Sequence, residues 1–250
     1  MGFRDTTEST TEAAHNVLKY LKLGIAELLH QIEGEDFWQI TINPKSDKAL
    51  VREFMKQVYL EIHWYQPDVI EATVSVIGQF PRALDATRIR TMLIHQAEEW
   101  DHGQMAFRDH VNLGGDPETA RNSFMSPTAF NTAAFWRMLV QKRTPFAYLG
   151  GLYLFEGLTP IVTARVKDSL SGNGIPSNAL EYIEFHSTED VRHTKIVDHL
   201  VVEVLRMFPH AAESVRFGFD AFRQVYPLPG WRAAFRRAAT LLETQTASST

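Results

Sequence analysis

Residues 186–193 read HSTEDVRH, a segment that carries two imidazoles and a carboxylate at helical spacing. His186, Asp190 and His193 stand at positions i, i+4 and i+7, so on an α-helix all three point within about 60° of one direction. Apolar residues flank this stripe, which predicts that it faces the interior of the protein. Imidazoles and a carboxylate that face inward together indicate a metal site. A solvated helix face held by ion pairs is the alternative interpretation.

A second set of ligand-type residues lies on an earlier segment with helical periodicity. Glu99 and His102 form the pattern E-x-x-H, and both share one helix face with His95. The segment is long and is expected to form a central helix, which favours Glu99 and His102 as further ligands. We interpret His95 as a residue that supports the ligands or packs in the core. We expect Glu98 and Asp101 to point aside.

A single carboxylate interrupts the most apolar part of the chain, residues 148–160, which read YLGGLYLFEGLTP. Glu156 is costly to bury there unless it is paired or bound to a metal ion. A buried salt bridge to Arg165 or Arg90 is the alternative to a metal role. Pro160 removes a backbone hydrogen bond to residue 156, so the helix is expected to bend beside the carboxylate.

Apolar residues recur every three to four positions along most of the chain, and no stretch alternates as a β-strand does. Polar N-caps, prolines at first helical positions and glycine-rich stops mark the expected helix ends. Helices are predicted over residues 11–30, 47–64, 67–80, 85–113, 127–143, 145–170, 177–208 and 211–226. The predicted fold class is all-α, with seven or eight helices in a single domain over residues 1–250, a core over about 11–242 and frayed ends.

Composition narrows the functional classes. The 250 residues are 44% hydrophobic and 22% charged, with a net charge of −5, which argues against binding to nucleic acid. The absence of cysteine excludes disulfides, thiolate nucleophiles and thiolate-ligated metal sites, and it fits a reducing cytoplasm, the expected location. The carboxylate in the most apolar run argues against a membrane span.

The three segments together supply six candidate ligands, namely Glu99, His102, Glu156, His186, Asp190 and His193. Oxygen and nitrogen donors without sulfur suit Fe(II) or Mn(II) better than Cu(I) or structural zinc. Six ligands exceed what one zinc ion with an open position needs, and they suit two metal ions that share a carboxylate. Two redox metals in an apolar helical core indicate O₂ chemistry, because such a core shields reactive species from water.

This set resembles the ligands of the heme-oxygenase-like diiron oxidases and oxygenases. The likeness spans roughly residues 45–210 and rests on the H-x-x-x-D-x-x-H motif, the glutamate upstream of it and an E-x-x-H followed by LGGD. It implies a heme-oxygenase-like bundle that binds two Fe(II) ions and uses O₂ as co-substrate. It also implies N-oxygenation, C–C cleavage, desaturation or decarboxylation of a small carboxylic acid or amino acid in specialised metabolism. Thiaminase-like and quinone-cofactor relatives of the same fold lack the full set, which favours the diiron branch.

Some members of that family use a further carboxylate from an earlier helix, for which Glu71 or Glu61 is the candidate here, although Glu61 is interpreted as a surface residue. Tyr153, Tyr182 and Glu71 are the candidate substrate-pocket residues. The expected partners are a small-molecule substrate, an electron donor and a second copy of the chain, with no nucleic acid and no membrane. Two alternatives stay open: a ferritin-like diiron carboxylate protein, for iron storage or hydroxylation, and a metal-free helical binding protein.

Overall fold

Helices build the architecture in the computed structural model, which describes residues 3–248 apart from the side chains of residues 3–10, 190, 191 and 248. No strand occurs within residues 3–248, so the predicted all-α class is confirmed. The α-helices are α1 (Phe3–Glu33), α2 (Asp36–Ile42), α3 (Lys48–Ile77), α4 (Ala86–Glu98), α5 (His102–Asn112), α6 (Pro117–Asn122), α7 (Pro127–Lys142), α8 (Pro145–Gly172), α9 (Glu181–Thr188), α10 (Asp190–Met207), α11 (Ala212–Arg223) and α12 (Leu228–Ser248). Short 3₁₀ turns are η1 (Glu99–Asp101), η2 (Ser177–Ala179) and η3 (Pro209–Ala211).

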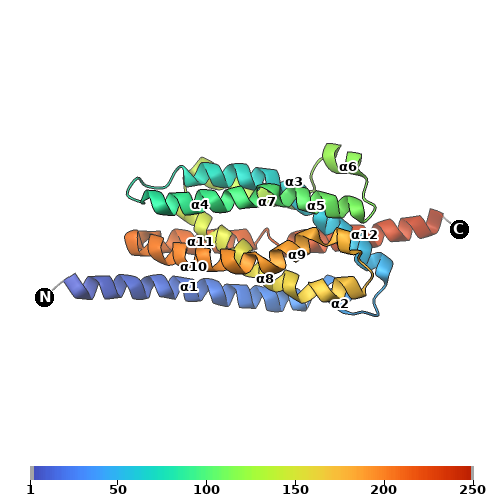
Figure 1. Cartoon of the computed structure of the whole chain (residues 1–250), viewed down its shortest axis with the longest axis horizontal. Helices are drawn as coiled ribbons and strands as arrows, with labels where there is room; N and C mark the ends of the chain where they lie inside the picture. The colour runs from blue at the N-terminus through green and yellow to red at the C-terminus, as the bar shows by residue number, and fades with distance from the viewer. Residues whose placement is uncertain (1–2, 249–250) are drawn as a thin grey trace.

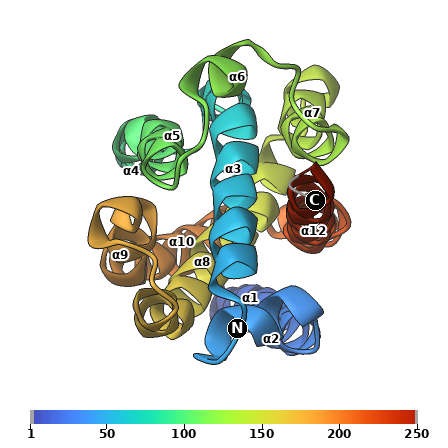
Figure 2. The same ribbon diagram turned by 90° about the vertical axis from the view of Figure 1, so that its right-hand side faces the viewer.

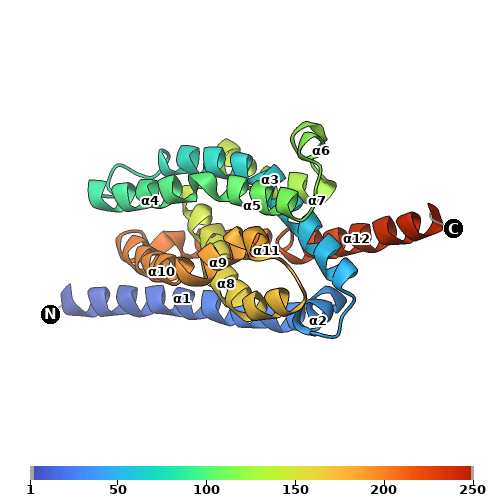
Figure 3. The same cartoon turned by 45° about the vertical axis from the view of Figure 1, so that its right-hand side comes forward.

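The helices form an elongated bundle. The helix α1 runs along one long side, α3, α4, α5 and α7 lie on the opposite side, and α8 to α11 lie between them (Figure 1). In the end-on view, α3 stands near the centre, with α4 and α5 beside it and α9 and α10 below them on the same flank (Figure 2). At the other end of the long axis from the start of α1, α12 extends beyond the bundle (Figure 3). The segments with candidate ligands are thus gathered on one flank.

Several predicted helix starts are confirmed by their caps. The Asp47 carboxylate accepts backbone hydrogen bonds at the start of α3, and Asp85 does the same for α4. The Ser126 hydroxyl caps α7, which has proline at its first position. Such caps satisfy backbone N–H groups that have no partner within the helix. The predicted start at Ser177 is wrong, because a 3₁₀ turn and Leu180 come before α9.

The helix α3 continues through Pro67, where the sequence predicts the start of a new helix. Proline inside a helix removes one backbone hydrogen bond, a cost that tertiary packing can offset. Here α5 crosses α3 closely, since a Cβ atom added to Gly103 would lie 3.0 Å from the Gln66 Cβ and 4.0 Å from the Pro67 Cδ. The close crossing of α3 and α5 holds the ligand-bearing segment against the long helix.

Two long predicted helices are each interrupted. The predicted helix over residues 85–113 is divided into α4 and α5 by the 3₁₀ turn η1, and Glu99 and His102 lie at that division. The predicted helix over residues 177–208 is divided at Glu189, between His186 and His193. Both interruptions lie among the candidate ligands, as is common where a helix carries a functional site.

The C-terminal region contains a helix that the sequence analysis does not predict. The predicted last helix ends at Tyr226, whereas α11 ends at Arg223 and is followed by α12. The Arg237 guanidinium on α12 donates a 2.5 Å hydrogen bond to Glu61 on α3. Glu61 is 4% exposed, so its interpretation as a surface residue is wrong. This ion pair between a buried carboxylate and a half-buried guanidinium ties α12 to α3.

The helix α8 passes through the middle of the bundle. It crosses α11 so closely that a Cβ atom at Gly150 would collide with the carbonyl oxygen of Val215, and one at Gly218 with that of Ala147. Glycine is required at such contacts because any side chain would force the helices apart. Although α8 is strongly apolar, none of the helices in the described part of the chain is long and apolar enough to cross a membrane.

Candidate metal centre

Side chains from separate elements converge on the ligand-bearing flank of the bundle. They are His95 on α4, Glu99 in η1, His102 on α5, Glu156 on α8, His186 on α9 and His193 on α10. All except Glu99 are buried, and the Glu99 side chain is 13% exposed. They form two groups of potential ligand atoms, each with its atoms within 4.8 Å of one another, and Glu99 belongs to both.

The first group combines two imidazoles with two carboxylates. The Nε2 atom of His95 lies 3.1 Å from Oε1 of Glu156. The Nδ1 atom of His193 lies 3.5 Å from Oε2 of Glu156 and 3.4 Å from Oε1 of Glu99. Two imidazole nitrogens and two carboxylate oxygens at this spacing match the donors that Fe(II) and Mn(II) prefer.

The second group lies on the other side of Glu99. Its Oε2 atom is 2.6 Å from Nδ1 of His102, and that nitrogen is 3.1 Å from Nε2 of His186. The Oε1 atom of Glu99 faces the first group instead. One carboxylate therefore presents one oxygen to each group, which is how a carboxylate shared by two metal ions is arranged.

Two hydrogen-bonding features fit a cation in these groups. Oε1 of Glu99 is buried and has no hydrogen-bond partner among the described residues. Nδ1 of His186 lies 2.7 Å from the carbonyl oxygen of Tyr182, to which it donates, so Nε2 keeps its lone pair and faces His102. A histidine oriented by a backbone carbonyl in this way is the usual form of a metal ligand.

The protonation states also suit metal binding. Burial, followed by the neighbouring His102 ring, lowers the pKa of His186 to about 3, so this imidazole stays neutral. Burial would raise the pKa of Glu156, but the imidazoles of His95 and His193 outweigh it and hold that pKa well below its ordinary value. A neutral imidazole and an ionised carboxylate are the forms that coordinate metal ions.

A buried polar network supports His95 from behind. Nε2 of Gln96 lies 3.0 Å from Nδ1 of His95 and 3.3 Å from the Tyr148 hydroxyl, and Oε1 of Gln96 accepts a 2.5 Å hydrogen bond from Thr73. In this orientation Gln96 donates to Nδ1, which leaves the His95 proton on Nε2. A metal ion on Nε2 requires that proton on Nδ1, and a half-turn of the Gln96 amide would present its oxygen to accept it.

Comparison with known proteins places this site in a family. Residues 52–226 match the family described as iron-containing redox enzyme, and that range includes all six residues of the two ligand groups. The chain belongs to this family of iron-containing redox enzymes. No curated protein matches the chain.

Solved structures show the fold of this iron-containing redox enzyme. A domain of unknown function with a heme oxygenase-like fold from Shewanella denitrificans aligns with a TM-score of 0.67 and 19% identity, covering 93% of this chain and 95% of that one. A TenA homolog from Pseudomonas syringae pv. tomato aligns with a TM-score of 0.61 and 10% identity, covering 92% of each chain. The predicted heme-oxygenase-like fold is confirmed, and it replaces the four-helix architecture that the ferritin-like alternative requires.

The enzyme brings five of the six predicted ligands together, namely Glu99, His102, Glu156, His186 and His193. The side chain of Asp190, the sixth, lies outside the described residues. Within the described part of the chain, Glu156 faces imidazoles rather than the arginines of the alternative interpretation, and Arg165 pairs with Glu33.

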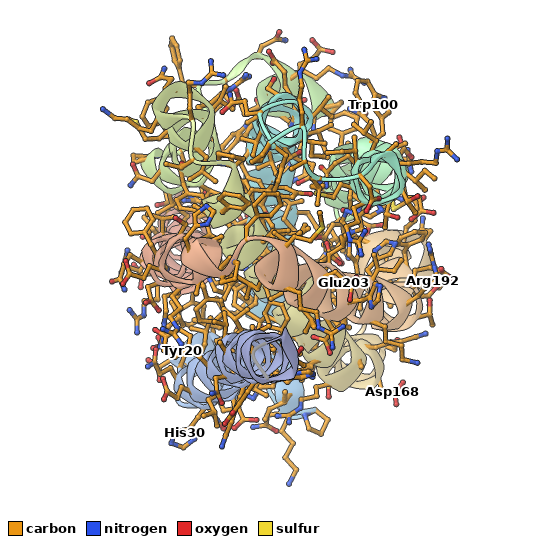
Figure 4. The ribbon with its side chains drawn as sticks, turned by 90° about the vertical axis from the view of Figure 1, so that its left-hand side faces the viewer. Tyr20, His30, Trp100, Asp168, Arg192 and Glu203 are labelled. Carbon is orange, nitrogen blue, oxygen red and sulfur yellow. The ribbon has the colours of Figure 1, made fainter. Side chains whose placement is uncertain are left out.

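His95, interpreted above as a residue that supports the ligands or packs in the core, is buried and also belongs to the first group of residues that could hold a metal ion. The signal was present in the sequence, because His95 and Glu99 are spaced i, i+4 on one helix face. Glu98 differs from expectation: its Oε2 atom lies 3.0 Å from Nε2 of His193 and 2.9 Å from Arg192, which extends on the outer side of α10 (Figure 4). Glu98 therefore holds the outer nitrogen of a candidate ligand, whereas Asp101 points aside as expected and pairs with the guanidinium of Arg108.

The other candidate residues lie in different surroundings. Glu71 is exposed and pairs with Arg137, away from both ligand groups. The Tyr153 hydroxyl bonds to Asp198. The Tyr182 ring stacks on His186 with 3.8 Å between the ring centres. Of the candidate pocket residues, Tyr182 is thus the one in direct contact with a candidate ligand.

A small cavity of about 30 Å³ adjoins the two ligand groups. Its walls include Glu99, Glu156 and His186 together with apolar residues such as Phe155 and Leu152. Roughly 10–15 Å³ suffices to hold one water molecule, so a diatomic molecule fits the space. Small reactants therefore have room beside the candidate ligands.

Proposed function

We propose that this enzyme is an O₂-activating non-haem diiron oxidase or oxygenase that acts on a small carboxylic acid or amino acid. The observation that carries the proposal is the position of Glu99, whose two oxygens face two separate groups of ligand atoms. One metal ion would need only one of these groups. Membership in an iron-containing redox family supports iron as the metal.

The residues divide naturally between the two irons. His95, Glu156 and His193 would hold one iron, His102 and His186 the other, with Glu99 shared. Asp190 remains a predicted further ligand. When bound, two Fe(II) ions supply two electrons and open coordination positions for the reduction of O₂.

Besides holding the metal ions, the chain would fix the geometry of the site and exclude water from the cavity beside it. Trp136, Phe155 and Leu152 give the cavity beside the ligands an apolar wall. Such surroundings strengthen electrostatic interactions and limit side reactions with water. Complete reduction of O₂ takes four electrons, so the substrate or an external donor must supply the other two, and an electron donor is the proposed partner where the substrate does not.

The test uses protein loaded anaerobically with Fe(II) and then exposed to O₂. A panel of small carboxylic and amino acids should contain compounds that accelerate O₂ consumption, and Glu99→Gln should reduce the accelerated rate at least about 100-fold. Glu53→Gln is the matched control, because Glu53 is buried but pairs with Lys56 and Gln57 instead. An accelerated rate that survives Glu99→Gln, or protein that takes up no iron, would contradict the proposal.

A further inference from the structure

A second cavity, of about 70 Å³, lies between α2, α3, α8 and α9. Its walls are aromatic and aliphatic and include Trp38, Met55, Ile62, Val162 and Ile183. Roughly 10–15 Å³ suffices to hold one water molecule, so this cavity has room for roughly five non-hydrogen atoms. The space is therefore larger than a packing defect of one methyl group.

Three hydroxyl groups in these walls already donate hydrogen bonds to backbone carbonyls. The Thr41 hydroxyl donates to the carbonyl of Phe37, and the Thr163 hydroxyl donates to that of Thr159. The Tyr59 hydroxyl donates to the carbonyl of Ala179. A polar group placed among these residues would have to give up its own hydrogen bonds with water, whereas an apolar group would not.

The apolar cavity begins next to the metal centre. Thr159 and Tyr182 line both this cavity and the smaller one beside the ligands. Along α8, Glu156, Thr159 and Val162 follow one another at three-residue spacing and so lie on adjacent turns. A molecule whose head lies beside Glu156 would reach the apolar cavity by passing Thr159 and Tyr182, which the two cavities share.

We infer that this cavity binds an aliphatic arm of the substrate, a straight chain of a few carbon atoms whose carboxylate head faces the two ligand groups. The inference rests on the proposed function and narrows its substrate class. A basic or acidic arm is disfavoured, because its charge would be buried without a partner. The preferred substrates are therefore aliphatic acids, or amino acids with an aliphatic side chain.

The first experiment measures binding to protein loaded with Mn(II), which allows equilibrium measurements without turnover. The probes are the straight-chain monocarboxylates from acetate to octanoate and the straight-chain 2-amino acids from alanine to norleucine. Affinity should rise about fourfold for each methylene group until the cavity is filled, and lysine should bind at least about tenfold more weakly than norleucine. Comparison of the two series shows whether the head is a plain carboxylate or an amino acid.

Two substitutions in the cavity wall should change, in opposite directions, the chain length of the ligand that binds most tightly. Val162→Phe fills the cavity and should shorten the preferred chain, while Met55→Ala enlarges it and should lengthen the preferred chain. Leu205→Ala is the matched control, because Leu205 is buried on α10 and does not line this cavity. The two wall variants test the same point by opposite changes, so a failure of one to fold leaves the other decisive.

The outcomes separate this inference from the proposed function. If Mn(II) binds but affinity varies less than twofold along both series, the inference is overturned while the metal centre stands. If an optimum exists but neither wall variant moves it, the arm binds elsewhere and the inference is also overturned. If no metal binds, the proposed function fails and the inference fails with it. Xenon bound by the metal-free protein would then identify the cavity as a packing void only.

Discussion

The hydroxyl of Thr194 on α10 donates a 2.5 Å hydrogen bond to the backbone carbonyl oxygen of Glu156 on α8. This carbonyl lacks its usual helical partner, because Pro160, four residues later, has no N–H group. The proline therefore frees an acceptor beside a candidate ligand, and a residue adjacent to His193 uses it. One hydrogen bond from a side chain to the backbone thus links two ligand-bearing helices.

Replacement of Thr194 by valine tests this link. Thr194→Val keeps the shape of the side chain but leaves the carbonyl of Glu156 without this donor, which should lower the free energy of unfolding by about 1–2 kcal/mol. Metal affinity should fall as well, because α10 is less firmly held. Thr194→Ser keeps the hydroxyl and is the control. Equal urea unfolding curves and equal Mn(II) affinities for valine and threonine would show that the bond has no such role.

Gln96 is expected to tune the metal centre through His95. Gln96→Met removes the amide while keeping a similar length, so it should weaken Mn(II) binding by about 10- to 100-fold. Gln96→Glu should retain affinity, since a carboxylate accepts the Nδ1 proton of His95. Gln66→Met is the control, because Gln66 is also buried and lines the same small cavity. Equal losses of Mn(II) affinity at positions 96 and 66 would indicate a general packing effect instead.

Substitution of a histidine that belongs to only one ligand group should remove one metal ion. His95→Ala and His186→Ala act on different groups, so each should leave about one Fe(II) per chain after anaerobic loading and desalting. The ferritin-like alternative predicts an unchanged iron content for His186→Ala. His110→Ala provides the control, since His110 is buried but bonds to the carbonyl of Lys56. Two irons in His186→Ala would count against the second group.

Asp109 should give the metal-free protein a distinct pH dependence. Its carboxylate accepts backbone hydrogen bonds from Glu181 and Tyr182 at the start of α9, and burial raises its pKa from 3.8 to about 6. Below pH 3.8 the group is protonated in both the folded and unfolded states. Between pH 3.8 and 6 the unfolded chain releases this proton first, so stability falls as pH rises.

The size of this effect follows from the shift in the Asp109 pKa. As the pH rises from about 4 to 7, ionisation of Asp109 should lower the free energy of unfolding by on the order of 2–3 kcal/mol. Asp109→Asn has no group that ionises there, so this part of the pH dependence should disappear. Urea unfolding of the metal-free proteins across this range measures the difference between wild type and variant. A wild type that keeps or gains stability relative to Asp109→Asn as pH rises from 4 to 7 would contradict the assignment.

The ligands on each helix were predictable where the helical period alone places them. His186 and His193 share a stripe at i, i+7, and this spacing keeps them together although α9 and α10 are separate helices. The breaks between α4 and α5 and between α9 and α10 were not predictable, because the apolar residues keep the same helical period on both sides of each break. The spacing i, i+4 places His95 on the helix face of Glu99, but its contact with Glu156 depends on how far α4 lies from α8, a tertiary distance that no local pattern contains.

The helix α12, which the sequence analysis does not predict, has a similar explanation. Two prolines, at positions 227 and 229, follow Tyr226 and indicate a turn, which hides the start of α12. Its tie to the core is the pair between Arg237 and Glu61, residues far apart in the sequence. The sequence analysis interprets Glu61 as a surface residue, because the partner that makes its burial possible lies beyond the last predicted helix.

Anaerobic Fe(II) titration of the wild-type protein and of Glu99→Ala tests the central claim most directly. Because Glu99 belongs to both ligand groups, the wild type should bind about two irons per chain and the variant should lose tight binding at both positions. A wild type that binds one iron or none, or a Glu99→Ala variant that still binds two, would contradict the shared centre.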